Sequence, residues 1–470
     1  MSRRLLADVS WLWAGYAGRS LAYLAVTILL THSLGPHGFG ELSLFMAFGL
    51  GVASLAGSWP FLAIPILANR GRRVAEIFRP AIHLAAIGTL ACLVLALPLA
   101  WKILAPSAAV LLMLSIYAAA LVSFQGLYGV FQAESRMREI ATVQTGERVL
   151  TLAILLAIVF ASTITVRLAE GTLAAAAVAA SGIAYLTLVK REDLFGDGPD
   201  LSLDWRTVLK TIGAMGIVNA ASYGVAWIDI YLLAAFKPDA DVGIYSLAYQ
   251  VYTFALQLAS LWIVATLPRH AKSHHAGIPL AEQLPRETML MGIRVWASLI
   301  GFGAVIAAPA LAAVFGSSFT DSAQPLMILL VGASFLAAYL AVVSALIAAD
   351  ESPLIARVSI VCVALNIAID IALIPTVGLI GPAIATTVQS AVGAAWLISH
   401  ALGAGRLREI VKANAPVAVA IAALAVDPSS LPLLALTTIV SALSLVPALH
   451  WLRDSGRSLL AARGDSPLQP

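Results

Sequence analysis

The sequence predicts an all-α integral membrane protein with about fourteen transmembrane helices, on three observations. Of its 470 residues, 60% are hydrophobic and 11% are charged, and the mean hydropathy is +0.93. One water-soluble core cannot bury that much apolar surface. Apolar runs of about 20 residues, the length that crosses roughly 30 Å of hydrocarbon, follow one another along nearly the whole chain. The basic residues are distributed unevenly between the loops that connect these runs.

Fourteen apolar segments are candidates for spans. They lie at residues 9–32, 41–66, 81–104, 107–131, 143–161, 168–189, 210–236, 242–267, 288–315, 323–348, 356–376, 379–401, 413–426 and 431–452. The thirteenth is the shortest and could instead be a short or re-entrant segment. The first is too long for the core of a signal peptide and is expected to be retained.

The basic residues indicate the orientation of these spans. If the N-terminus is cytoplasmic and fourteen spans follow, 24 of the 28 Lys and Arg residues fall on the cytoplasmic side. The remaining four are Arg19, Lys102, Arg167 and Lys237. Such an asymmetry predicts that both termini face the cytoplasm.

An internal duplication is the clearest feature of the organisation. With a shift of 203 residues, Gly40, Trp59 and Pro65 each meet the same residue type, and Gly40 meets Gly243. Matches of Gly, Trp and Pro in one register are uncommon by chance. The two copies begin six crossings apart, so they run in the same direction and predict two six-helix lobes related by a parallel pseudo-twofold axis.

This duplication divides the chain into five parts. The N-terminal lobe covers 1–190, a polar cytoplasmic linker covers 191–206, and the C-terminal lobe covers 207–402. Two further helices, within 403–452, and a cytoplasmic tail, 453–470, lie outside the repeat.

The repeated motif begins in the stretch "SLGPHGFGELSLF", Ser33 to Phe45. Gly35, Pro36, Gly38 and Gly40 predict a tight turn on the outer face, because glycine accepts positive φ and proline ends a helix. A purely structural hairpin explains the stretch, and a turn that also helps to close an outer gate is the alternative.

Signatures of common enzymes do not occur in the sequence. It contains no Walker-type loop, no Gly-x-Ser-x-Gly elbow, no Cys-x-x-Cys and no His-Glu-x-x-His. The histidines of "RHAKSHH" are typical of a solvated basic loop near anionic headgroups, with metal binding as the alternative. We therefore expect no enzyme, no cofactor, no metal and no nucleic-acid partner.

Arg19 is the first candidate for substrate binding, because an ionisable residue deep in a span usually faces a cavity or a partner. Tyr16 and Tyr23 lie on the same helix face as Arg19. A guanidinium binds phosphate oxygens in a fork and aromatic faces stack on sugar rings, which suits a diphosphate that carries sugars. Pairing of Arg19 with a carboxylate or carbonyl of a neighbouring helix is the alternative.

Three other polar residues within spans are candidates. Asp229 and Asp370 could bind a coupling proton or cation, or could hydrogen-bond the backbone or snorkel to the interface. Gln257 could line the cleft, although interhelical hydrogen bonding explains it equally well. Glu147 and Arg148, in contrast, are interpreted as a charged cytoplasmic end of the fifth span.

Three stretches resemble one known family. The turn "LGPHGFGELSLF", its partner "VGIYSLAY" and the run "LNIAIDIALIPTVGLIGPAIATT" (Leu365 to Thr387) are similar in order and spacing to the polysaccharide-exporter branch of the multidrug/oligosaccharidyl-lipid/polysaccharide exporter superfamily. The resemblance covers nearly the whole chain. It implies a flippase for polyprenyl-diphosphate-linked sugar units, as in O-antigen (lipopolysaccharide) or exopolysaccharide assembly, that works by alternating access. Lipid II flippases of this superfamily carry a functional basic residue in the first helix, where Arg19 lies.

The expected function is therefore outward movement of a lipid-linked oligosaccharide across the bacterial cytoplasmic (inner) membrane. Its expected partners are the lipid-linked substrate, membrane lipids and, beyond these, a polysaccharide polymerase and glycosyltransferases. A cation-coupled multidrug exporter of the same fold is the first alternative, and Arg19 disfavours cationic substrates. A membrane-embedded glycosyltransferase or polymerase is disfavoured by the short outer loops, and a non-transporting scaffold by charges within the spans.

Overall fold

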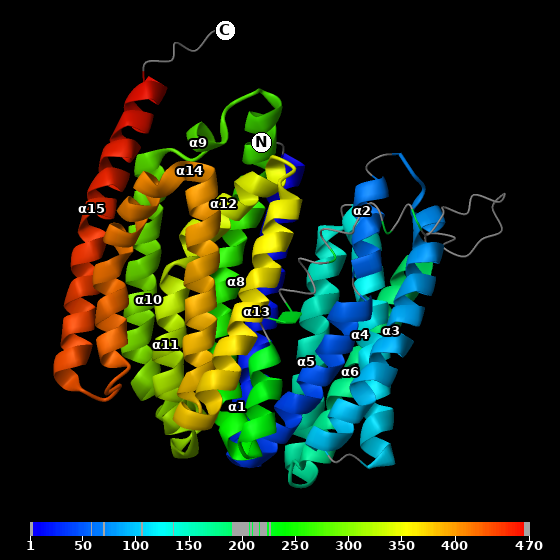
Figure 1. Cartoon of the computed structure of the whole chain (residues 1–470). Coiled ribbons are helices and arrows are strands. Elements are labelled where there is room, and N and C mark those ends of the chain that lie inside the picture. Colours follow the sequence, from blue (N-terminus) through cyan, green and yellow to red (C-terminus); the bar gives the residue numbers. More distant parts are fainter. Residues whose placement is uncertain are drawn as a thin grey trace. The chain divides into compact units, whose positions relative to one another are not determined.

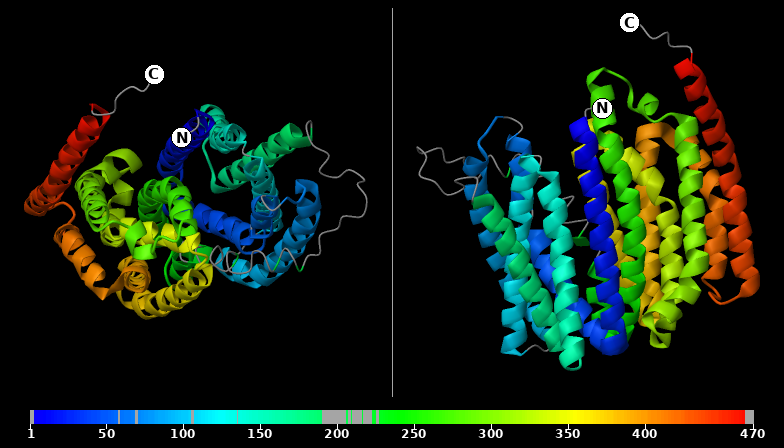
Figure 2. Two further views of the ribbon diagram at one scale, coloured as in Figure 1. Left: turned by 90° about the horizontal axis from the view of Figure 1, so that it is seen from above. Right: turned by 180° about the vertical axis from the view of Figure 1, so that it is seen from behind.

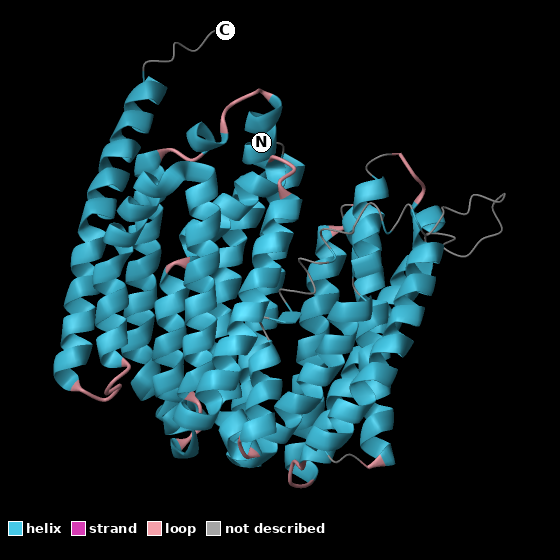
Figure 3. Cartoon of the chain, in the orientation of Figure 1, coloured by secondary structure: helices cyan, strands magenta, loops and turns pink. Residues whose placement is uncertain are grey.

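The computed structural model describes residues 3–57, 59–68, 71–104, 107–134, 136–189, 206, 209, 216, 223–224 and 227–464. Within these residues every regular element is a helix and no strand occurs (Figure 3). The elements are α1 (Arg3–Val52), η1 (Ala53–Gly57), η2 (Trp59–Leu62), α2 (Ala63–Ala68), α3 (Val74–Leu104), α4 (Ala108–Ala133), α5 (Met137–Ala161), α6 (Val166–Val189), α8 (Asp239–His275), α9 (Leu280–Gln283), α10 (Arg286–Phe315), η3 (Ser317–Ser322), α11 (Ala323–Ser334), α12 (Leu336–Ala348), α13 (Ser352–Val377), α14 (Ile380–Leu424) and α15 (Leu431–Gly464) (Figure 1). The predicted all-α class is confirmed.

The chain forms two compact units, Met1–Ser246 and Leu247–Pro470, which divide within α8. The linker predicted at 191–206 lies outside the described residues except for Arg206. The predicted lobe boundaries therefore stay a prediction.

In the first unit, α1 packs along α5, and α4 packs along α6 (Figure 2). An apolar core joins α2, α3 and α4, and its largest buried side chains include Phe61, Phe78 and Phe131. In the second unit, α14 contacts α11 and α13 extensively, and α15 packs on α10 and α14 (Figure 2).

The turn in the repeated motif is shorter than predicted. Gly35 alone has non-helical angles, with φ of 62°, and Pro36 follows it at the start of the second half of α1. Gly38 and Gly40 lie within that second half and are packing positions rather than turn residues. The prediction that all four residues form the turn is wrong, because one positive φ followed by proline is enough to reverse the chain.

Several predicted spans are broken helices. The second, 41–66, changes to π-helix at Ala53 and to 3-10 helix at Trp59, beside Pro60. The tenth, 323–348, divides into α11 and α12 with a bend of 47°. The indole of Trp296 donates a hydrogen bond of 2.8 Å to the carbonyl of Ala333 near this bend, which satisfies a backbone group that a membrane cannot.

The twelfth and thirteenth predicted spans both lie in α14, which is interrupted at Gly403, where φ is 82°. After this glycine the chain stays helical to Leu424, so the thirteenth segment is longer than the 413–426 expected from its apolar residues. Its first turns carry Arg406, Glu409 and Lys412, which conceal the helix from a search for apolar runs.

Helices of both units present apolar side chains outward. Leu95, Phe160 and Val419 are exposed by 77%, 90% and 67%. Within the described residues, eight helices are long and apolar enough to cross a membrane, or nine if the bent pair is one span. The chain is therefore a multi-pass membrane protein, and the exact number of fourteen spans stays a prediction.

Candidate functional site

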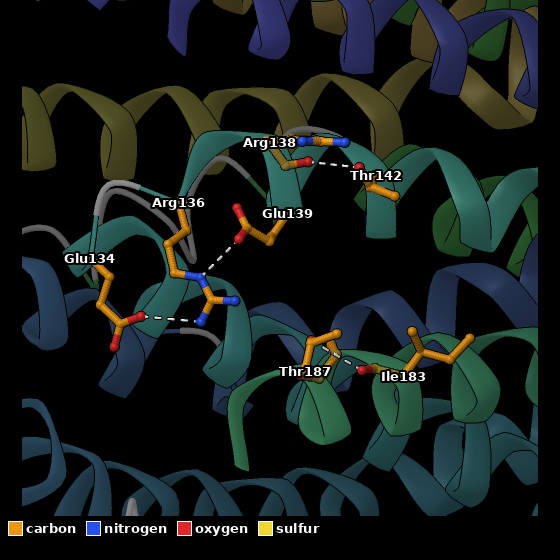
Figure 4. A network of polar contacts seen from close by, with 8 residues as sticks. Glu134, Arg136, Arg138, Glu139, Thr142, Ile183 and Thr187 are labelled. Atoms are coloured by element: carbon orange, nitrogen blue, oxygen red, sulfur yellow. Dashed lines mark hydrogen bonds and ion pairs between the residues drawn. The ribbon is translucent and has the colours of Figure 1, made fainter. Parts of the chain in front are cut away.

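The start of α5 is fixed by a polar turn after α4. Arg136 donates hydrogen bonds of 3.3 Å to Glu134 and 3.2 Å to Glu139 (Figure 4). Its guanidinium also lies 4.9 Å from the ring centre of Phe131. One arginine thus joins the end of α4 to the first turn of α5. This turn places the helix start at Met137, so that residues predicted to lie at its end lie well inside it.

Small residues let the first half of α1 lie against α5. A Cβ on Gly15 would lie 2.5 Å from the Cβ of Ala141, and one on Gly18 would lie 3.0 Å from Thr145. Thr145 donates a hydrogen bond of 3.1 Å to the carbonyl of Gly15. Such close packing of small residues is typical of helix contacts in membranes, where hydrophobic burial does not drive association.

Arg148 lies on α5, close to the contact between α1 and α5, and is buried inside the first unit. It is 8% exposed, and its Nε lies 3.1 Å from Oε2 of Glu147. Its guanidinium also lies 5.1 Å from the centre of the Tyr23 ring on α1, within the range of a cation–π interaction. Because α5 begins at Met137, Arg148 lies three turns inside the helix rather than at its start, and its interpretation as part of a charged cytoplasmic end of the span stays a prediction.

Tyr117 on α4 completes the surroundings of Arg148, which donates a side-chain hydrogen bond to it. The Tyr117 ring stacks on Phe45 with centres 5.5 Å apart. Gly49, one turn further along α1, leaves room for that ring, since a Cβ there would overlap it. Both halves of α1 and helices α4 and α5 therefore meet around one buried guanidinium.

The structure places two predicted site residues in this cluster. Tyr23 is within electrostatic range of both Arg148 and Arg19, and Arg19 is half-buried on α1. Tyr16 is helical, but its side chain lies outside the described part of the structure. We refer to Arg19, Tyr23, Tyr117, Glu147 and Arg148 as the arginine cluster.

The arginine cluster carries a formal charge of +1, from two guanidinium groups and one carboxylate. A buried positive charge in a membrane protein is costly unless it has a partner, and Arg148 has one in Glu147. Arginine is also the side chain best suited to bind a diphosphate, because its fork of donors matches two phosphate oxygens. The cluster therefore combines a stable resting ion pair with groups that can receive an anion.

Asp229 is fully buried near the beginning of the short apolar helix Trp227–Phe236. Its Oδ2 accepts a hydrogen bond of 2.6 Å from the hydroxyl of Tyr245 on α8. This agrees with a hydrogen-bonded carboxylate, although the donor is a side chain rather than the backbone. Its predicted coupling role stays a prediction.

Asp370 and Asn366 lie one turn apart on α13 and are both fully buried. Helix α13 packs on α14 in the second unit. Asp370 thus does not snorkel to an interface, and the prediction that it binds a coupling ion stays untested. Gln257 lies half-buried on α8, in the second compact unit.

The prediction missed Arg148 and Tyr117, although the sequence held a signal for the first. The polar stretch from Glu134 to Arg138 would have placed the helix start before the apolar run and put Arg148 three turns inside it. Tyr117 carried no such signal, because its role depends on the return of α1 past α4.

The fold is that of membrane transporters and flippases. The chain matches a lipid II flippase, MurJ, in an inward closed conformation, with a TM-score of 0.72 and 11% identity over 95% of this chain and 99% of that one. It matches an inward-facing multidrug resistance MATE family transporter of the MOP superfamily with a TM-score of 0.60 and 18% identity, over 84% and 96% of the two chains. The MATE transporter VcmN of Vibrio cholerae, in a bent form, matches with a TM-score of 0.53 and 16% identity, over 86% and 98%.

Residues 5–274, more than half of the chain, match the family described as polysaccharide biosynthesis protein. The chain belongs to that family, and the resemblance inferred from its sequence motifs is confirmed. No curated protein sequence matches the chain.

Proposed function

We propose that this protein is a flippase that moves a polyprenyl-diphosphate-linked oligosaccharide outward across the bacterial cytoplasmic membrane, by alternating access, for the assembly of a cell-surface polysaccharide such as O-antigen or exopolysaccharide. Both termini face the cytoplasm in this proposal. Glycosyltransferases act before it, and a polysaccharide polymerase after it, on the same lipid-linked units.

The arginine cluster is the observation that carries the proposal. A flippase for an anionic headgroup needs a positive group within the membrane that attracts the diphosphate and also releases it. Arg148 meets both needs, since Glu147 satisfies its charge at rest and competes with the arriving anion. Membership of the polysaccharide biosynthesis family supports a substrate that carries sugars.

The residues of the cluster have distinct roles in this proposal. Arg19 and Arg148 bind the diphosphate oxygens, one from α1 and one from α5. Tyr23 lies against Arg148 and within electrostatic range of Arg19, and it offers its ring face and hydroxyl. Glu147 holds Arg148 in place when the substrate is absent. Asp229 and Asp370 remain candidates for a coupling proton or cation, with Gln257 as a candidate polar contact.

Deletion of the gene tests the substrate class in cells. We expect lipid-linked sugar units to accumulate facing the cytoplasm, where a periplasmic polymerase cannot reach them. Restoration by the wild-type protein and not by Arg19→Ala would connect the effect to the cluster. Unchanged topology of the lipid-linked units would contradict the proposal.

A cation-coupled multidrug exporter is the alternative, and the similarity of the fold to MATE transporters favours it. That function needs acidic groups that hold cationic drugs and coupling ions, for which Asp229 and Asp370 are the candidates. Altered resistance to cationic dyes with unchanged glycolipid topology would favour the exporter.

A further inference from the structure

The two glycines that the duplication relates, Gly40 on α1 and Gly243 on α8, touch each other. A Cβ on Gly40 would lie 2.9 Å from the backbone nitrogen of Gly243, and a Cβ on Gly243 would lie 2.9 Å from the backbone nitrogen of Gly40. Real Cβ atoms essentially never approach that closely, so both positions require glycine. We call this contact the glycine crossing.

The neighbours of the two glycines are related in the same way. A Cβ on Gly40 would overlap the carbonyl oxygen of Asp239, and a Cβ on Gly243 would overlap that of Pro36. Pro36 and Asp239 are themselves 203 positions apart, as are the glycines. Exchanging the two copies therefore exchanges the two contacts, which is the property of an interface on a twofold axis.

Each side of the crossing is anchored by its own ion pair or hydrogen bond. Glu41, next to Gly40, pairs with Arg167 on α6 at 3.2 Å, and Arg167 also pairs at 3.0 Å with Glu170, which is fully buried. On the other side, Tyr245 of α8 hydrogen-bonds Asp229. The crossing thus joins a segment fixed to the first copy to a segment at the start of the second copy.

The surface of the crossing suits repeated opening and closing. At Gly40 and Gly243 the two helices meet through backbone atoms, so neither residue has a side chain that must change its rotamer when they separate. One contact beside it, with 3.7 Å between Nδ1 of His37 and Oδ2 of Asp239, is largely exposed and therefore weak. Membrane helices commonly meet through small residues in this way.

We propose that the glycine crossing is the contact through which the two copies meet on the internal pseudo-twofold axis. The contact is closed in this conformation, and it opens when the protein changes the side of the membrane to which its substrate site is accessible. The symmetry carries the first half of this statement. The second half rests on the proposed function, because it requires a transport cycle.

The test compares Gly40→Ala, Gly243→Ala and the double variant, each as the full-length protein in lipid nanodiscs. Gly182→Ala is the matched control, since a Cβ at this helical position of α6 meets nothing within 4 Å. Hydrogen exchange of the segments 36–45 and 239–246 is measured by mass spectrometry, because it reports local opening without any substrate. Transport of a lipid-linked sugar is measured in parallel.

We expect each single variant to increase exchange in both segments by roughly tenfold, which corresponds to about 1.4 kcal/mol of lost closed-state stability. The double variant should resemble the singles, because both substitutions break one contact. Transport should fall in all three variants, and Gly182→Ala should resemble the wild type in both measurements.

Two outcomes would overturn the proposal. If each substitution changes exchange only in its own segment, or if the double variant shows the product of the two single effects, the glycines are separate packing sites. If exchange responds symmetrically but transport by the variants equals that of the wild type, the crossing does not part in the cycle. Failure of the proposed function is distinguishable, since the wild type itself would then not move the lipid-linked sugar while the exchange results stand.

Discussion

Removal of Arg148 tests whether the arginine cluster is a desolvated ion pair. The side chains of Arg148 and Glu147 are 10% and 13% exposed, and 3.1 Å separate Nε from Oε2. Removal of one partner of a buried pair leaves the other charge without compensation, which typically costs about 3–5 kcal/mol. Since a tenth of each side chain remains exposed, we expect the low end, about 3 kcal/mol, for Arg148→Gln. That energy lowers the folded-to-unfolded ratio more than roughly hundredfold.

The double variant Glu147→Gln/Arg148→Gln separates stability from function. It removes both charges, so neither charge is left buried without its partner. We expect stability within about 1 kcal/mol of the wild type, but a loss of transport, because the phosphate-binding guanidinium is gone.

The assay is unfolding of purified protein in mixed micelles, followed by circular dichroism, with the four combinations of the two sites forming a double-mutant cycle. Transport is measured for the same four proteins. If Arg148→Gln is as stable as the wild type, the pair is solvated and the reasoning fails. If the double variant transports normally, Arg148 does not bind the substrate.

Two further predictions concern other polar contacts. Tyr245→Phe removes the 2.6 Å hydrogen bond to the buried Asp229 and should lower stability by about 1.5–3 kcal/mol, the range for hydrogen bonds to charged groups, in the same unfolding assay; an unchanged midpoint would contradict this. Arg286 donates hydrogen bonds to Glu409 and thereby lowers the pKa of that carboxyl. The pair should therefore stabilise the protein fully at pH values above the ordinary glutamate pKa of about 4.3. This stabilisation should be lost as the pH falls through the lower pKa that Glu409 has in the folded protein. Glu409→Gln should abolish that part of the acid dependence, and an identical dependence in the variant would contradict the assignment.

The fold class was predictable because each membrane span is a long apolar run in the sequence, and such a run can be recognised without knowledge of tertiary contacts. The family was predictable because the motif around Gly40 occurs in a recognisable order with its partner around Gly243. What apolar runs do not mark are breaks and polar helix ends. The part of α14 that follows Gly403 was therefore missed, because it begins with charged residues. The break in the second span near Pro60 was missed because the residues around it are apolar.

Prediction of the site was limited by long-range packing. Arg19 and Tyr23 could be grouped as candidates because they share one face of one helix, which sequence spacing encodes. Arg148 and Tyr117 join them from α5 and α4, and that convergence depends on how α1 turns back at Gly35 and on the close packing of Gly15 with Ala141. Gly40 was predicted to be a turn residue because a single sequence does not distinguish two kinds of glycine. One kind is needed for a positive φ, and the other, like Gly40, is needed because a neighbouring helix comes too close for a side chain.

The most direct test of the account is flipping of a polyprenyl-diphosphate-linked oligosaccharide by the purified protein in liposomes, followed by the accessibility of the sugar to an added lectin. The account predicts flipping well above that of protein-free liposomes, partial activity for Arg19→Lys, which keeps the charge but loses the fork, and none for Arg19→Ala at equal incorporation. Flipping by Arg19→Ala at the wild-type rate would contradict the role of Arg19 in binding the diphosphate. Export of cationic dyes by a wild-type protein that does not flip the lipid-linked sugar would contradict the central claim.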